Sequence, residues 1–358
     1  MPGELVPWEH GSEFALFTNE RGGGPQLPAG GDLYGSGRDA IRAILRHGRN
    51  TIGWTTLWVP SYFCQTVLKD IQTPGILLRP YGDSPLDDES EPIELPSDGL
   101  GVVLTLNPFG LRTRNRPLDV DRARIWVIED HTHDPWSPLV GKSQADFCVA
   151  SLRKTIPIPD GGILWSPVGH PLPVCPGPTG IRLDASTQKL TGMALKSLFL
   201  SGIGNHKLLS RKLLASGEDE IARGEISGMP YATQSLMQGF NALEWRARRL
   251  QNFNVLASRL GQIPNVRVLL PTSNDAVPFC VVLQLPLAKI RNALRQRLID
   301  SNVYPAILWS LEDPQITEVR TSDLALSRRM LTIHCDGRYS VNHMLQVAEI
   351  VEERMRQI

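Results

Sequence analysis

Short apolar runs alternate with amphipathic stretches along the first half of the chain. Residues 38–47 place apolar side chains at helical spacing and predict a helix, and residues 63–71 predict another. Nearly continuous apolar runs predict strands buried on both faces, because such strands have no solvated side; they cover 56–60, 75–79, 101–106, 124–128, 147–150 and 162–165. Strands of this kind that alternate with helices are typical of the α/β class, with a mostly parallel sheet covered on both faces.

The pattern changes after residue 178. Residues 185–260 predict helices, and their clearest amphipathic stretch, 234–260, is broken once. A smaller α+β set follows and ends in a helix over 342–356. Its other elements are predicted over 266–270, 279–285, 287–301 and 331–334.

This organisation predicts three parts. The Gly-, Pro- and acid-rich residues 1–33 form an N-terminal arm without a core of its own, residues 34–251 form a large domain, and residues 252–358 form a smaller C-terminal domain. A chain of 358 residues is long enough to bury a sizeable core.

The charge balance excludes several partners. The 37 Lys and Arg residues equal the 37 Asp and Glu residues, so the formal net charge is zero. A neutral chain without a long basic run has no electrostatic footprint for nucleic acid or an anionic membrane, and no run of 18 apolar residues predicts a membrane span. The start MPGELVPWEHGSEF is acidic where a secretory signal would be basic and then apolar. We therefore expect a cytoplasmic protein that acts on small molecules.

The cysteines and histidines predict no metal site. Five cysteines lie far apart without a Cys-x-x-Cys pair, at Cys64, Cys148, Cys175, Cys280 and Cys335. Their odd number and wide spacing argue against a disulfide framework and against zinc, so reduced thiols are expected. His131 and His133 beside Asp134 do not form a recognised ligand set.

The turn Gly35-Ser36-Gly37-Arg38 comes directly before the first predicted helix. Small residues let backbone N–H groups approach an anion, and the helix N-terminus adds partial positive charge. Alternatively, Ser36 serves only as the N-cap of the helix.

An apolar strand over 125–128 delivers Glu129 and Asp130 at its end. A carboxylate in this place can hold a proton on a heteroaromatic nitrogen. The alternative is that Asp130 caps the next turn and that His133 is an ordinary polar residue.

Lys154 leaves an apolar strand and precedes a Pro-rich turn that ends in Gly161-Gly162. Burial of a lysine lowers its pKa, and only the neutral amine attacks a carbonyl to form a Schiff base. Ser151, three positions earlier, is placed to reach a phosphate. The alternative for this segment is a surface basic pair followed by a turn.

Two further places carry candidate binding residues. Tyr62 and Phe63 follow a buried strand, where an aromatic ring either stacks on a flat ligand or packs in the core. Arg338 is a candidate anchor for a substrate carboxylate, because a guanidinium pairs with it in a bidentate way. Alternatively, Arg338 is an exposed residue of a turn.

Taken together and in this order, the segments YGSGRDAI, VPSYFC, VIEDHTHD and ASLRKTIPIPDGG resemble the fold-type I pyridoxal-phosphate enzymes, and more closely the DegT/DnrJ/EryC1/StrS branch of sugar aminotransferases. The resemblance covers about residues 30–350. It implies an aspartate-aminotransferase-like large domain, pyridoxal 5'-phosphate as cofactor, and an amino donor and a keto or aldehyde acceptor as substrates. It also implies a homodimer with the active site at the subunit interface.

The resemblance assigns roles to individual residues. It implies that Lys154 forms the Schiff base with the cofactor, that Asp130 pairs with the pyridine nitrogen, and that His133 lies near the phenolic oxygen. It further implies that the cofactor phosphate is bound by four residues, Ser36, Gly37, Arg38 and Ser151. Tyr62 or Phe63 would stack on the cofactor ring.

The chain departs from the family pattern in two places. The Asn-aromatic-Arg-Met signature of the family has no close match downstream, and residues 204–207 resemble it only weakly. After the lysine, Pro-x-Pro-Asp-Gly-Gly stands in place of the usual small residues. These departures indicate an outlying subgroup whose acceptor need not be a nucleotide sugar.

Two other functions stay open. The same cofactor supports elimination, racemisation and carbon–carbon bond formation, because it supplies the electron sink in all of them. A fold of this kind can also serve a non-catalytic, ligand-binding protein. The presence of both Asp130 and Lys154 argues against the non-catalytic alternative.

Overall fold

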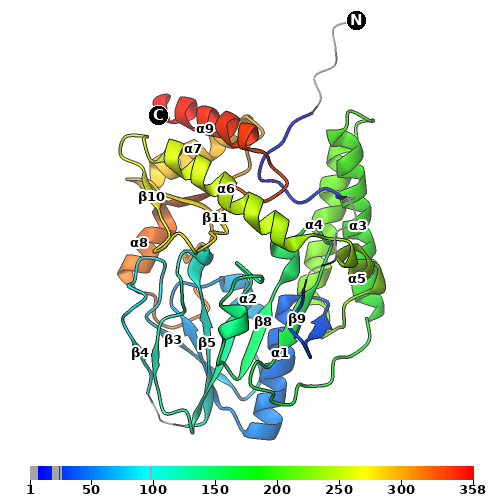
Figure 1. Cartoon of the computed structure of the whole chain (residues 1–358), viewed down its shortest axis with the longest axis vertical. Helices are drawn as coiled ribbons and strands as arrows, with labels where there is room; N and C mark the ends of the chain where they lie inside the picture. The colour runs from blue at the N-terminus through cyan, green and yellow to red at the C-terminus, as the bar shows by residue number, and fades with distance from the viewer. Residues whose placement is uncertain (1–6, 18–23, 25, 97–98) are drawn as a thin grey trace, which may run out of the picture.

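The computed structural model describes residues 7–17, 24, 26–96 and 99–358. Seven strands form its central sheet, in the spatial order β1-β9-β8-β7-β5-β2-β3 (Figure 1). In this order they are β1 (Asp32–Tyr34), β9 (Gly162–Trp165), β8 (Phe147–Ala150), β7 (Ile125–Asp130), β5 (Gly101–Leu106), β2 (Thr56–Pro60) and β3 (Leu77–Tyr81). The strands from β8 to β3 pair in parallel, whereas β9 pairs antiparallel with both β8 and β1. The predicted α/β class with a mostly parallel sheet is confirmed.

Side chains of the sheet alternate between two buried cores. Ile128 of β7 and Val149 of β8 point to the core that contains α1 (Gly37–His47) and α2 (Gln65–Asp70). Val127 and Cys148, one residue earlier on each strand, point to the opposite core, which holds residues of α5 (Tyr231–Gln238) and the start of α6 (Ala242–Leu260). Both faces of the sheet are therefore dry, which explains the continuous apolar runs.

Two long helices, α3 (Gly180–Leu200) and α4 (Lys207–Arg223), pack side by side next to the sheet (Figure 1). The predicted helical region 185–260 is thus four helices, and α3 begins five residues earlier than predicted. The break predicted within 234–260 is confirmed, because α5 ends at Gln238 and α6 begins at Ala242.

The C-terminal part has its own antiparallel sheet of three strands, in the order β10 (Arg267–Leu269), β11 (Cys280–Gln284) and β12 (Met330–His334). Three helices accompany it, α7 (Ala288–Asp300), α8 (Thr321–Arg329) and α9 (Val341–Arg356). A small parallel pair, β4 (Ile93–Glu94) with β6 (Leu118–Asp119), lies apart from both sheets. Among the described residues, no helix is long and apolar enough to cross a membrane.

Helix α6 joins the two parts of the chain. Its start buries Ala242 and Trp245 in the core under the central sheet, and its second half buries Phe253 and Leu256 in the C-terminal core. The predicted domain boundary at residue 252 falls within this continuous helix, at the point where its buried face passes from one core to the other.

Part of the predicted N-terminal arm, at positions 1–6, 18–23 and 25, lies outside the described residues. The described segment that begins at residue 7 packs on the C-terminal part. His10 exchanges backbone hydrogen bonds with Asn302 and Tyr304, and the partly buried Trp8 contacts the C-terminal core. Strand β1 lies inside the predicted arm, and it was not predicted because three residues carry too little pattern. Helix α8 was missed as well.

One buried ion-pair cluster fastens α6 to the loop after β7. The Asp134 carboxylate accepts hydrogen bonds from the guanidinium groups of Arg246 and Arg249, at 2.7 Å in each case. Arg249 is only 2% exposed, so loss of its partner would leave a buried charge without compensation.

We expect Asp134→Asn to lower the free energy of unfolding by about 3–5 kcal/mol, because the buried Arg249 charge loses its carboxylate partner. The measurement is urea unfolding followed by circular dichroism. Glu312→Gln is the control, because Glu312 and its partner Arg328 are both exposed and the change should leave the unfolding midpoint almost where it is. An unshifted midpoint for Asp134→Asn would contradict the role of this cluster.

Candidate active site

A cavity of about 440 Å³ opens at the carboxyl ends of the central strands, and residues of the C-terminal part and of the N-terminal arm complete its wall. Ligands of parallel α/β sheets bind in this position. Nine of the ten candidate residues line the cavity: Ser36, Gly37, Arg38, Phe63, Asp130, His133, Ser151, Lys154 and Arg338. The tenth, Tyr62, does not.

The glycine turn and the loop that carries Lys154 are bound together. Gly161 N–H donates to the Gly35 carbonyl at 2.8 Å, and Leu152 N–H donates to the Gly161 carbonyl at 3.1 Å. A Cβ atom on Gly37 would lie 2.8 Å from Cβ of Ser151, and one on Gly162 would lie 2.4 Å from the Ser36 carbonyl carbon. Only glycine permits these approaches, which bring the start of α1 to Lys154.

The start of α1 presents a cradle for an anion. Ser36 caps the helix, since its Oγ accepts from Asp39 N–H at 3.1 Å, and its hydroxyl donates to the Asp39 carboxylate. The first N–H groups of a helix have no partner within the helix, and here the residues that carry them, Gly37 and Arg38, line the cavity. Ser151 lines the same place, with its own N–H donated to Thr132 Oγ1.

Arg38 contributes little free charge to this cradle. Its guanidinium pairs with Asp70 at 2.5 Å and with Glu218 of α4 at 3.1 Å. The side chain therefore already has two carboxylate partners, and the backbone N–H of Arg38 is the group that remains for an anion.

The Lys154 side chain is accessible from the cavity, and its amine makes no hydrogen bond with the described residues. The neighbouring Arg153 charge and burial by the surrounding protein lower the pKa of Lys154 to about 8, against the opposing charges of Glu218 and Glu13. A larger share of neutral amine is thus present at neutral pH than for an ordinary lysine. This is the state that attacks an aldehyde.

A charge cluster beside Lys154 was not predicted from the sequence. Glu218 accepts from Arg153 and from Lys189 of α3, each at 2.7 Å. Burial raises the pKa of Glu218, but Arg153 and Lys189 outweigh it and hold that pKa far below its usual value. Glu218 lies 64 residues beyond Lys154 in a surface-like helical pattern, so no sequence signal points to it.

Asp130 ends β7 on the same face as the buried Ile128, which directs it toward α1 and the cavity. One carboxylate oxygen accepts from Thr132 N–H at 2.9 Å. The Thr132 side chain also hydrogen-bonds to this carboxylate, which has no ion pair with a described residue. Burial raises the pKa of Asp130, against the hydrogen bonds from Thr132. A cationic N–H donor in the cavity would stabilise this carboxylate.

His133 is held as a neutral ring. Burial lowers its pKa to about 4, and its Nδ1 accepts from the Phe109 N–H at 3.0 Å. The ring stacks on Trp309, with 5.6 Å between centroids and 19° between planes. Trp309 also lines the cavity, and it comes from the C-terminal part, where no motif indicated it.

The two aromatic candidates point to different places. Phe63 lines the cavity, and its ring centroid lies 6.0 Å from that of Trp309. Tyr62 is 1% exposed, belongs to the core between the two parts, and donates its hydroxyl to the Leu308 carbonyl at 2.9 Å. Of the pair, Phe63 is the residue that can touch a ligand.

Arg338 lines the cavity and is mostly buried, which differs from the exposed turn residue considered as the alternative. Its Nε and Nη2 donate to both oxygens of Asp336, at 2.8 and 2.9 Å. Its Nη1 donates to the carbonyls of Ser12 and Glu13, at 2.8 and 3.3 Å. Much of the guanidinium fork is therefore engaged within the protein.

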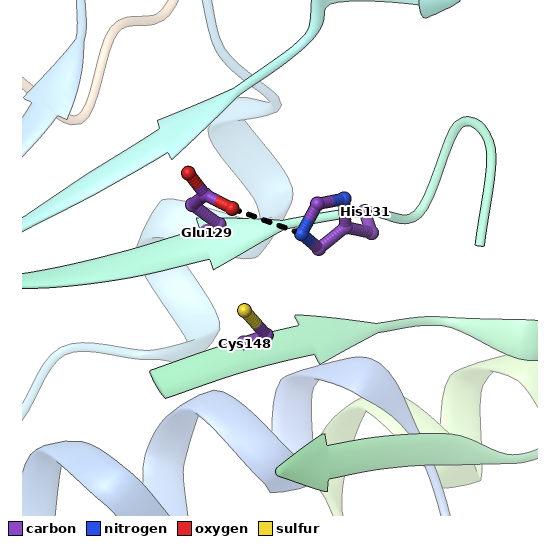
Figure 2. Close-up of side chains that lie close together, drawn as sticks. All are labelled: Glu129, His131 and Cys148. Carbon is purple, nitrogen blue, oxygen red and sulfur yellow. Dashed lines mark hydrogen bonds and ion pairs between the residues drawn. The ribbon is translucent and has the colours of Figure 1, made fainter. Parts of the chain in front are cut away.

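A second polar cluster lies on the other face of the sheet. Figure 2 shows Glu129 at the end of β7, His131 after it, and Cys148 on the adjacent β8. His131 Nε2 is 3.1 Å from Glu129, and the Ser143 hydroxyl donates to the same carboxylate at 2.7 Å. Burial raises the pKa of the Cys148 thiol well above its usual value. His131 and Glu129 share a hydrogen bond, and Cys148 Sγ lies 3.3 Å from Ser143 Oγ. A metal ion bound here would have to displace these contacts.

No protein-family model matches the chain, and none of the curated proteins matches it. Solved structures do. DesI with its TDP-sugar product is 15% identical, with a TM-score of 0.57 over 91% of this chain and 81% of that one. 3-Amino-5-hydroxybenzoic acid synthase is 15% identical, with a TM-score of 0.57 over 92% and 87%. NtdA from Bacillus subtilis with bound PMP is 12% identical, with a TM-score of 0.58 over 91% and 73%. At such identities the likeness shows the fold, which is aspartate-aminotransferase-like.

We expect a small acylating reagent to label the amine of Lys154 at a rate that rises with pH and reaches half its maximum near pH 8, because the pKa of Lys154 is about 8. Peptide mass spectrometry of the ligand-free chain across a pH series measures this. Arg153→Gln should move the midpoint upward, because Arg153 is the largest cause of the low pKa. Arg248→Gln, on the exposed face of α6, should leave it unchanged. A wild-type midpoint near the ordinary 10.5 would show that the amine is not activated.

Proposed function

We propose that the chain is a pyridoxal 5'-phosphate-dependent aminotransferase, which moves an amino group from an amino acid donor to a keto or aldehyde acceptor. One observation carries the proposal: Lys154 and Asp130 line the same cavity, and neither side chain has an ion pair with a described residue. The first group suits an aldehyde and the second suits a protonated ring nitrogen. The ordered sequence segments support the proposal, and so does the fold shared with DesI and NtdA.

The residues around the cavity fit this cofactor. The N–H groups of Gly37 and Arg38 and the hydroxyl of Ser151 would hold its phosphate at the start of α1. Phe63 offers an aromatic face to its ring, and the neutral His133 lies in the same wall. The cavity then has room beside Lys154 for a small amino donor or acceptor.

Lys154 and Asp130 divide the proton chemistry. When bound, pyridoxal phosphate supplies the electron sink for a carbanion at the substrate. Asp130 would keep the proton on the ring nitrogen, because no cation among the described residues already pairs with its carboxylate. Lys154, with a pKa of about 8, would take and return the proton at the substrate α-carbon as general base and acid.

We also propose that the protein is a homodimer, as the family resemblance implies. Large apolar side chains are exposed along the α3–α4 pair, which supports contact with a second copy: Ile181, Leu183, Leu198, Leu208 and Leu209. These side chains lie outside the cavity wall.

We expect borohydride reduction of the chain loaded with pyridoxal phosphate to fix the cofactor on Lys154, and Lys154→Ala to abolish this. Mass spectrometry of the peptide identifies the site. L-Glutamate should then release 2-oxoglutarate, whereas a different product from the donor would indicate elimination, racemisation or carbon–carbon bond formation. A wild-type chain that takes up no cofactor contradicts the proposal and favours a non-catalytic protein of this fold.

We expect Asp130→Asn to slow the reaction with the preferred amino donor by about 100-fold or more, because it removes the charge that holds the ring proton. Single-turnover absorbance measurements give the rate. Glu129→Gln is a matched control from the same strand, because the Glu129 side chain lies on the opposite face with His131 and Cys148. Similar losses in both variants would show that Asp130 has no special role.

A further inference from the structure

Among the described residues, every arginine that lines the cavity has a carboxylate partner. The pairs are Arg38 with Asp70, Arg153 with Glu218, Arg249 with Asp134, and Arg338 with Asp336. Two of the four carboxylates in the wall, Glu218 and Asp336, are used in these pairs. Three charged side chains remain without an ion pair, and they are Lys154, Asp130 and Glu13. The proposed function uses the first two and leaves Glu13.

Glu13 belongs to a segment of the N-terminal arm, residues 9–14, which we call the strap. Glu13 lines the cavity, and its exposed side chain makes no ion pair or hydrogen bond with a described residue. Burial raises the pKa of Glu13, but the nearby charges of Lys189, Lys154 and Arg153 outweigh it and leave that pKa below its usual value. The carboxylate is therefore ionised at neutral pH, and it lies near enough to Lys154 for the two charges to interact.

The strap is fixed in place from both sides. The Arg338 fork donates to the carbonyls of Ser12 and Glu13, and Lys196 of α3 donates to Ser12 Oγ at 2.6 Å and to the Glu13 carbonyl. Gly11 N–H donates to the Tyr339 hydroxyl at 2.7 Å. Arg338, already paired with Asp336, thus acts as a positioning residue for Glu13. A group held in this way is preorganised for a ligand.

We propose that Glu13 binds a hydrogen-bond-donating group of the substrate, a hydroxyl or an ammonium, at a position other than the reacting amine or carbonyl. The inference rests on the proposed function. An ionised carboxylate only accepts hydrogen bonds. When a bound substrate displaces the water around Glu13, the carboxylate needs a donor, and a substrate that lacks one leaves a desolvated charge unpaired. The favoured substrates are therefore hydroxylated amines or diamines.

The test uses amines that differ in one terminal group. L-Homoserine, L-2,4-diaminobutyrate and L-norvaline carry a hydroxyl, an ammonium and a methyl on the same skeleton, and 5-hydroxynorvaline, L-ornithine and L-norleucine extend it by one carbon. Spectral titration of the chain loaded with pyridoxal phosphate gives their affinities. We expect the hydroxyl or ammonium member of one length to bind about 10- to 100-fold more tightly than the methyl member.

Two variants assign this preference to Glu13. Glu13→Ala should abolish the preference for either polar group over methyl. Glu13→Gln should abolish a preference for the ammonium group but keep part of a preference for the hydroxyl group, because the amide oxygen still accepts a hydrogen bond. Glu312→Gln, on the exposed surface, should behave as wild type. A wild-type chain without preference at either length, or a preference that survives in Glu13→Ala, overturns the proposal.

A second readout separates this inference from the proposed function. Glu13 raises the pKa of Lys154, so Glu13→Gln should shift the labelling midpoint of Lys154 to lower pH in the cofactor-free chain. An unchanged midpoint shows that Glu13 does not face Lys154 and overturns the inference. If the wild-type chain takes up no pyridoxal phosphate, the proposed function fails. In that case the same amines are titrated calorimetrically into the cofactor-free wild type and into Glu13→Ala. Tighter binding of the hydroxyl or ammonium amine by the wild type, lost in Glu13→Ala, would support the role of Glu13, and its absence from the wild type would overturn that role.

Discussion

The backbone contact between the start of α1 and the loop around Lys154 is the constraint on which the site depends. Gly161 and Leu152 carry its hydrogen bonds, and the missing side chains of Gly37 and Gly162 let the two segments touch. Because β7 ends next to this contact, Asp130 reaches the same space. An anion cradle, an amine and a carboxylate thus meet at one edge of the sheet, although more than a hundred residues separate Gly37 from Lys154 in the chain.

The charges of the cavity fall into two groups. The arginines are neutralised by carboxylates within the protein. These pairs join α1 to α2 and α4, the Lys154 loop to α4, and α6 to the loop after β7, and one pair lies within the C-terminal part. Lys154, Asp130 and Glu13 have no such partner within the described part of the chain. A paired charge mainly fixes structure, because its field is already compensated, whereas an uncompensated charge in a partly dry cavity interacts strongly with a ligand. The chemistry of the site is expected from the second group.

Much of the fold could be predicted from the sequence, and less of the site. Burial on both faces leaves apolar runs without interruption, so β2, β5, β8 and β9 match their predicted ranges residue by residue. Strand β1 is too short to show a period, and the turns between α3, α4 and α5 carry weak signals within a long helical pattern. Lys154 and Asp130 stand in motifs next to strands. Glu13, Glu218 and Trp309 reach the cavity only through tertiary contacts, which no local pattern records.

We propose that the carboxylate of Asp130 and the amine of Lys154 together bind one heteroaromatic aldehyde. Nitrogen-15 NMR of the chain loaded with pyridoxal phosphate labelled at the ring nitrogen tests this most directly. The account predicts a protonated ring nitrogen in the wild type at pH 8 and loss of that proton in Asp130→Asn. A ring nitrogen that is unprotonated in the wild type, or whose signal is the same in both proteins, would contradict it.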